Sequence, residues 1–122
     1  MTSMTIGFAG LGLIGGSIAK ALHRVHPDYR LIAYDTNKDS LIQALADGVL
    51  NETCDSISAA FSSCDIIFLC APVSINIKHL EILKPFIKDN CILTDVGSVK
   101  TSIHKAVRDA GLSTHFVGGH PM

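Results

Sequence analysis

The sequence predicts an α/β fold, a doubly wound parallel sheet, from three observations. Short apolar runs alternate about six times with segments of helical periodicity along the 122 residues. The run at 66–70 is apolar without alternation, which is typical of a parallel strand covered on both faces. The stretch 10–15, G-L-G-L-I-G, stands between a predicted strand and a predicted helix. We therefore expect a single domain over residues 1–122, with right-handed crossovers.

Each element follows from its local pattern. The first helix, over 13–25, carries Ile14, Ile18 and Leu22 on one face, and a Pro-Asp pair follows it. Thr36 or Asn37 is expected to cap the second helix. Strands are expected at 6–9, 30–34, 49–53, 66–70, 91–94 and 115–117, and the remaining helices at 38–46, 56–62, 73–83 and 99–110.

Composition narrows the class of protein. The net charge of −1 gives no electrostatic reason to expect a nucleic acid or an anionic membrane as partner. No apolar run approaches the roughly 20 residues that span a bilayer, and the N-terminus lacks a signal-like core. The four cysteines include no C-x-x-C pair, so we expect buried thiols and neither a disulfide nor a metal site. These features predict a cytoplasmic protein.

The glycine stretch predicts a dinucleotide site. Gly10 allows a tight turn, Gly12 lets the backbone approach a diphosphate, and Gly15 lets the new helix pack on the strand. The backbone N–H groups at the start of that helix, at Leu13 and Ile14, are expected to face the phosphates.

An acidic residue at the end of the second strand indicates which dinucleotide binds. Asp35 lies twenty residues after Gly15, where a carboxylate is expected to accept hydrogen bonds from the adenosine ribose. The same charge repels a 2′-phosphate, and no arginine follows it, so NAD is favoured over NADP. Lys38 keeps NADP as the alternative cofactor, and a simple helix cap is the alternative role for Asp35.

Three further strand ends are expected at the ligand edge of the sheet. Small residues at Ala71 and Pro72 leave room for a flat cofactor, although without the glycine motif an ordinary strand-to-helix turn would be the preferred interpretation. Gly97 and Ser98 follow the next strand, where Ser98 either bonds substrate or caps a helix. His120, held in a Gly-Gly-His-Pro turn, is either an acid or base near neutral pH or a surface histidine.

Together these residues resemble the prephenate dehydrogenase family, which includes arogenate dehydrogenases. Five matching stretches span the chain in the family's order: 10–17, 33–35, 69–73, 94–100 and 116–122. Other nicotinamide dehydrogenases share the first three, so the last two are the most specific to this family. The resemblance implies a Rossmann domain that binds NAD(P).

The resemblance also implies a reaction and two catalytic residues. Family members carry out NAD(P)-dependent oxidative decarboxylation of a cyclohexadienyl acid, which for prephenate gives 4-hydroxyphenylpyruvate in tyrosine biosynthesis. His120 occupies the position of the family histidine that accepts the substrate's hydroxyl proton, and Ser98 that of the serine supporting it. Arogenate, which differs at the side chain, is the alternative substrate.

The chain departs from the family pattern in one respect. Family members continue into a mostly helical second domain, which forms a homodimer and supplies basic groups for the substrate carboxylates. The arginines here, Arg24, Arg30 and Arg108, are predicted to lie away from the site. We therefore expect residues 1–122 to be part of a longer two-domain enzyme, and to turn over little or no substrate alone.

Two rival interpretations come from other classes of protein. A non-catalytic NAD-binding sensor needs neither Ser98 nor His120. A flavodoxin-like domain with an accidental glycine motif predicts no affinity for NAD.

Overall fold

A computed structural model describes residues 3–96 and 100–117 of the chain, with backbone alone at 100–102 and 104. Five strands alternate with helices, as the apolar pattern predicts. In chain order the elements are β1 (Thr5–Ala9), α1 (Gly12–Val25), β2 (Arg30–Tyr34), α2 (Lys38–Ala46), β3 (Glu52–Cys54), the 3-10 helix η1 (Ala59–Ser63), β4 (Ile66–Leu69), α3 (Val73–Leu83), β5 (Ile92–Asp95) and α4 (Lys100–Asp109).

The five strands form one parallel sheet in the order β3-β2-β1-β4-β5. The central strand β1 pairs with β2 on one side and β4 on the other, so Ala9 lies between Tyr34 and Leu69. The strand order therefore reverses at the gap between β1 and β4. In open α/β sheets, ligands bind at the carboxyl ends of the strands at this point.

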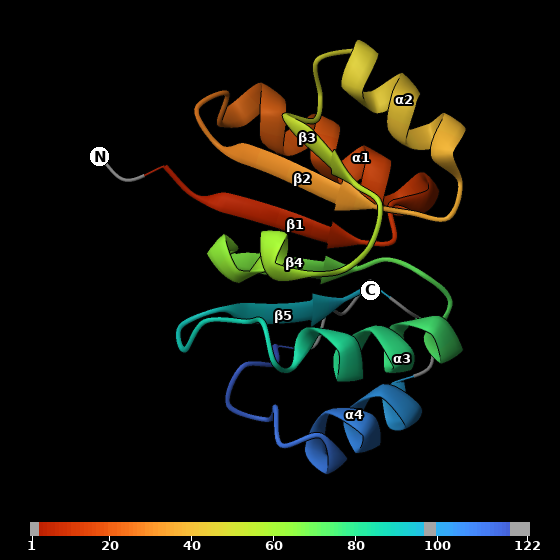
Figure 1. Cartoon of the computed structure of the whole chain (residues 1–122), viewed down its shortest axis with the longest axis vertical. Helices are drawn as coiled ribbons and strands as arrows, with labels where there is room; N and C mark the ends of the chain where they lie inside the picture. Colours follow the sequence, from red (N-terminus) through yellow and green to blue (C-terminus); the bar gives the residue numbers. More distant parts are fainter. Residues whose placement is uncertain (1–2, 97–99, 118–122) are drawn as a thin grey trace.

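Helices cover both faces of the sheet, with α1 and α2 over one and α3 and α4 over the other (Figure 1). Because side chains alternate along a strand, β1 supplies both cores: Ile6 and Phe8 pack under α1 and α2, whereas Ala9 packs on the opposite side. On that side, Phe61 of η1 and Leu80 of α3 are fully buried. The doubly wound fold expected from the sequence is confirmed.

Several predicted boundaries match the structure, and others differ for local reasons. β2, α2 and α3 have the expected bounds, and Asn37 caps α2 by accepting a hydrogen bond from the Ser40 N–H at 3.2 Å. The helix expected at 56–62 is a short 3-10 turn, in which only Phe61 is fully buried. The strand expected at 115–117 is a single bridge between Phe116 and Leu93 on β5. Across the described residues, no helix is long and apolar enough to cross a membrane.

Candidate functional site

The glycine stretch forms the turn between β1 and α1. Gly10 has a φ of +85°, a conformation that side chains disfavour, and its N–H donates to the Tyr34 carbonyl of β2 at 2.8 Å. Gly12, with a φ of +57°, begins α1. Gly15 is buried, and a Cβ there would lie 3.1 Å from the Cys70 sulfur. Gly10 thus forms the tight turn and Gly15 the close packing that the sequence predicts, whereas the approach of a diphosphate to Gly12 stays a prediction.

Asp35 reaches across from the end of β2 and holds this turn. Its Oδ2 accepts hydrogen bonds from the N–H groups of Leu11, at 2.8 Å, and Gly12, at 3.1 Å. Its Oδ1 accepts from the Asn37 N–H at 2.9 Å. Leu11 is the N-cap residue of α1 and offers no side-chain cap of its own. A carboxylate from another strand therefore supplies the cap and compensates the positive end of the helix dipole.

The same contacts set the charge of Asp35. Partial burial by itself raises the pKa of this carboxyl, but hydrogen bonds from backbone N–H groups, first those of Asn37 and Leu11, outweigh it. The pKa of Asp35 therefore lies below its ordinary value of 3.8. Asp35 is a full negative charge at neutral pH, beside the glycine turn.

The turn that follows β4 presses on the glycine turn from the other side. A Cβ built on Gly10 would lie 2.9 Å from the Ala71 Cβ and 3.0 Å from the Ala71 nitrogen. Pro72 then caps α3. The two turns enclose a cavity of about 250 Å³ lined by Gly10, Gly12, Tyr34, Asp35, Thr36, Cys70, Ala71, Pro72, Ile75 and His79. The structure thus brings together Gly10, Gly12, Asp35, Ala71 and Pro72, as predicted.

Two polar side chains of α3, not singled out by sequence reasoning, belong to this region. Asn76 is fully buried: its Oδ1 accepts from the Ala71 N–H at 3.0 Å, and its Nδ2 donates to the Leu69 carbonyl at 3.2 Å. His79 is 7% exposed and meets the Tyr34 ring edge-on, with centroids 5.9 Å apart. Their spacing in the sequence could have predicted that they are buried, because both share a helix face with the core residues Leu80 and Leu83.

Burial favours the neutral forms of two titratable side chains beside the turn after β4, those of His79 and Cys70. Desolvation lowers the pKa of His79, although a backbone hydrogen bond with Ala9 and the charge of Asp35 oppose the shift. Desolvation raises the pKa of Cys70 to about 12, aided by Asp35 and Asp95. The Cys70 thiol is therefore protonated at neutral pH, and the protonated form is not the nucleophilic one.

Other predicted site residues do not line this cavity or lie outside the described residues. Leu13 and Ile14, in the first turn of α1, are 90% and 56% exposed. Leu13 also lines a second hollow, between α1 and α2. Gly97, Ser98 and His120 fall outside the described residues, so their predicted roles stay predictions.

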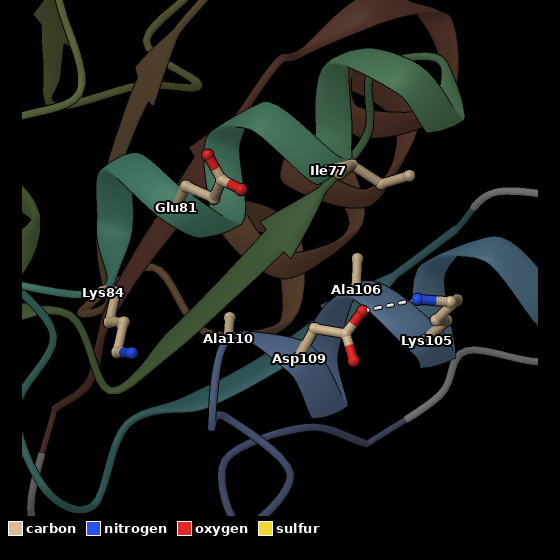
Figure 2. Close-up of a pocket in the computed structure, with 7 residues that line it drawn as sticks. All are labelled: Ile77, Glu81, Lys84, Lys105, Ala106, Asp109 and Ala110. Carbon is tan, nitrogen blue, oxygen red and sulfur yellow. Dashed lines mark hydrogen bonds and ion pairs between the residues drawn. The ribbon is translucent and has the colours of Figure 1, made fainter.

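A larger hollow, of about 590 Å³, lies between α3 and α4 and contains none of the predicted site residues. Figure 2 shows Lys105 and Asp109 paired along α4, with Glu81 and Lys84 on α3. These charges of both signs reach solvent, and most of the lining lies on the sides of the two helices. The smaller cavity at the strand ends is the better candidate because the glycine turn, a full charge and a helix start converge there.

The chain is similar in sequence to known proteins. The sequence profile of the family "Prephenate dehydrogenase, nucleotide-binding domain" matches residues 18–122. A prephenate dehydrogenase of Bacillus subtilis (strain 168) is 38% identical over 120 residues, which are 97% of this chain and 32% of the relative.

Solved structures agree with the sequence comparison. A prephenate dehydrogenase from A. aeolicus, in complex with hydroxyphenyl propionate and NAD+, superimposes with a TM-score of 0.88 at 30% identity, over 100% of this chain and 43% of that one. A Synechocystis arogenate dehydrogenase gives a TM-score of 0.85 at 36% identity, over 97% and 41%. The chain spans about a third of the length of the curated relatives it matches.

Proposed function

Because the chain belongs to the family of the prephenate dehydrogenase nucleotide-binding domain, we propose that it forms the NAD-binding part of an enzyme that oxidatively decarboxylates prephenate. The observation that carries the proposal is the single cavity where the glycine turn, Asp35 and the turn after β4 meet. The similar A. aeolicus enzyme was solved in complex with NAD+, and it shares 30% identity with this chain. We further propose that the whole enzyme is longer than this chain, has a second domain, and is a cytoplasmic dimer.

The residues of this chain fit such a cofactor. Gly10 and Gly12 bring backbone without side chains to the cavity, so a diphosphate can approach the start of α1 closely. Asp35 lines the same cavity as a full negative charge. A ribose diol donates to a carboxylate, whereas a 2′-phosphate is repelled by it, which supports NAD over NADP.

When bound, NAD supplies the hydride acceptor. The chain's own contribution is to bind and orient: the turn from Gly10 to Gly15 receives the diphosphate, and Asp35 receives the adenosine ribose. We assign His120 as the base that takes the substrate's hydroxyl proton, and Ser98 as its hydrogen-bonding support. In the sequence, Ser98 follows β5 and His120 follows the parallel bridge of Phe116 with Leu93, and β5 ends at the same edge of the sheet as the cavity.

Arogenate is the second candidate substrate, since the Synechocystis arogenate dehydrogenase is 36% identical to this chain. The two acids share the ring that reacts and differ at the side chain. We infer that the second domain distinguishes them, because the described cavity lies at the cofactor turn.

Calorimetry with the 122-residue chain tests the cofactor assignment. We expect NAD to bind at least tenfold more tightly than NADP, and Asp35→Asn to reduce that preference. Asp28→Asn is the matched control, because it removes the same charge from the exposed loop at the opposite edge of the sheet. Equal affinities of the native chain for both dinucleotides would contradict the role of Asp35.

Turnover of prephenate by the longer protein tests the role of His120 as the base. We expect His120→Asn to lower kcat with prephenate by about 100-fold or more, the range for a general base, while NAD affinity changes little. Unchanged turnover would rule out the base role.

A further inference from the structure

The turn after β4 is the wall that faces Asp35 across the cavity. Ala71 and Pro72 lie in this wall with Ile75 and His79 of α3, whereas Asp35 and Thr36 lie in the opposite wall. A carboxylate at the end of β2 is the group that receives the adenosine ribose in this kind of sheet. The space between the two walls is therefore where the adenosine half of a dinucleotide belongs.

The β4 wall has little freedom at its contact with the glycine turn. A methyl group on Gly10 would meet Ala71 at 2.9–3.0 Å, closer than carbon atoms pack. Ala71 is also restricted to extended conformations because Pro72 follows it. A small shift of this turn would therefore change the distance between the two walls directly.

Asn76 fixes the position of that turn. Its carboxamide is fully buried and uses both ends, accepting from the Ala71 N–H and donating to the Leu69 carbonyl. Leu69 is the last residue of β4, paired with Ala9 of β1. The side chain of α3 thus ties the start of the turn to the end of the strand.

We propose that Asn76 is a positioning residue, which holds the turn at 70–72 against Gly10 and thereby sets the wall on which the adenosine half of the cofactor binds. This inference rests on the proposed function, because it takes NAD as the ligand. Asn76 itself need not touch the ligand, since none of its side chain is exposed.

The test measures binding of AMP and NAD to the 122-residue chain by calorimetry. Asn76→Leu removes both hydrogen bonds with a side chain of similar volume, and we expect both affinities to fall at least fivefold. The control Leu83→Val perturbs the buried far end of the same helix. It should lower the melting temperature yet change both affinities less than twofold, because a purely structural defect does not weaken binding to the folded chain.

Asn76→Asp extends the test if the leucine variant does not fold. At neutral pH one carboxylate oxygen still accepts from Ala71, but the other faces the Leu69 carbonyl without a proton to donate. We expect affinities for AMP and NAD between those of the native chain and those of Asn76→Leu. If the leucine variant is unfolded, we expect affinities at least threefold below those of the native chain. Native affinity in the folded variants overturns this inference while the proposed function stands. A native chain that binds no NAD overturns both.

Discussion

The two walls of the cavity hold their turns with different chemical groups. On the β2 side, the ionised carboxylate of Asp35 accepts the N–H groups of Leu11 and Gly12 and remains partly accessible. On the β4 side, the neutral carboxamide of Asn76 makes two hydrogen bonds and is fully enclosed. A buried charge costs far more than a buried, hydrogen-bonded amide. The charge therefore stands only where water or a ligand can reach it.

This difference also separates what each wall can do. Asp35 both supports the glycine turn and presents a charge to the cavity, so one residue couples local stability to ligand choice. Asn76 has no exposed surface, so its effect on a ligand passes through Ala71. Changes on the two sides should accordingly differ in pH dependence and in size.

The largest effect is expected at Gly10, which contacts both walls. Gly10→Ala places a side chain at a φ of +85° and drives its Cβ against Ala71. Left-handed strain of about 1–2 kcal/mol and overpacking of about 1–3 kcal/mol should lower the free energy of unfolding by about 2–5 kcal/mol. Urea denaturation of the chain measures this. A loss below about 1 kcal/mol would mean that the two walls can move apart freely.

A smaller, pH-dependent effect should mark the charged wall alone. Because the folded-state pKa of Asp35 is lowered, its stabilisation is fully present above the ordinary value of 3.8 and is lost as the pH falls through the folded-state pKa. We expect Asp35→Ala to lose about 1 kcal/mol at pH 7, as for other helix caps, and to approach native stability in strong acid.

Asp65 titrates in the same acidic range, because a hydrogen bond from Lys88 lowers its pKa. The informative quantity is therefore the difference between native and variant at each pH, with Asp28→Ala as control. A difference that does not vary with pH would contradict the capping role of the Asp35 charge. Asn76→Leu should show no such acid dependence.

The smallest effects on the free energy of unfolding should come from Gly15 and Gly16, of which only Gly15 packs against the β4 wall. A Cβ at Gly16 meets no atom within 4 Å, whereas one at Gly15 lies 3.1 Å from the Cys70 sulfur. Gly16→Ala should therefore raise the free energy of unfolding by about 0.5–1 kcal/mol, the gain for alanine within a helix. Gly15→Ala should lower it by about 1 kcal/mol, because the cost of overpacking exceeds that gain. Thermal unfolding of the pair checks both signs.

The fold and the β2 wall are well predicted from the sequence because both depend on local signals. Apolar runs mark buried parallel strands, and the glycine spacing marks the turn before α1. Asp35 is found because its distance from the turn is set by one β-α-β unit. Its capping of α1 is not anticipated, because that contact joins residues 23 and 24 positions apart.

The β4 wall is harder to predict. Asn76 carries no motif, and its importance follows from burial and from two hydrogen bonds that only the packed helix reveals. The short 3-10 turn η1 is predicted as a brief helix, because apolar spacing over so few residues does not distinguish the two. Ser98 and His120 remain predictions from the family resemblance.

The register of the central strand also has a consequence for synthesis on the ribosome. β1 pairs with β4 across sixty residues, as in the contact of Ile6 with Ile66. Chains are made from the N-terminus, so the glycine turn emerges long before the wall that presses on it. Until α3 leaves the exit tunnel, a nascent chain has β1, α1 and β2 but lacks the β4 wall of the cavity. The cavity is therefore completed late, by a contact between residues far apart in the sequence.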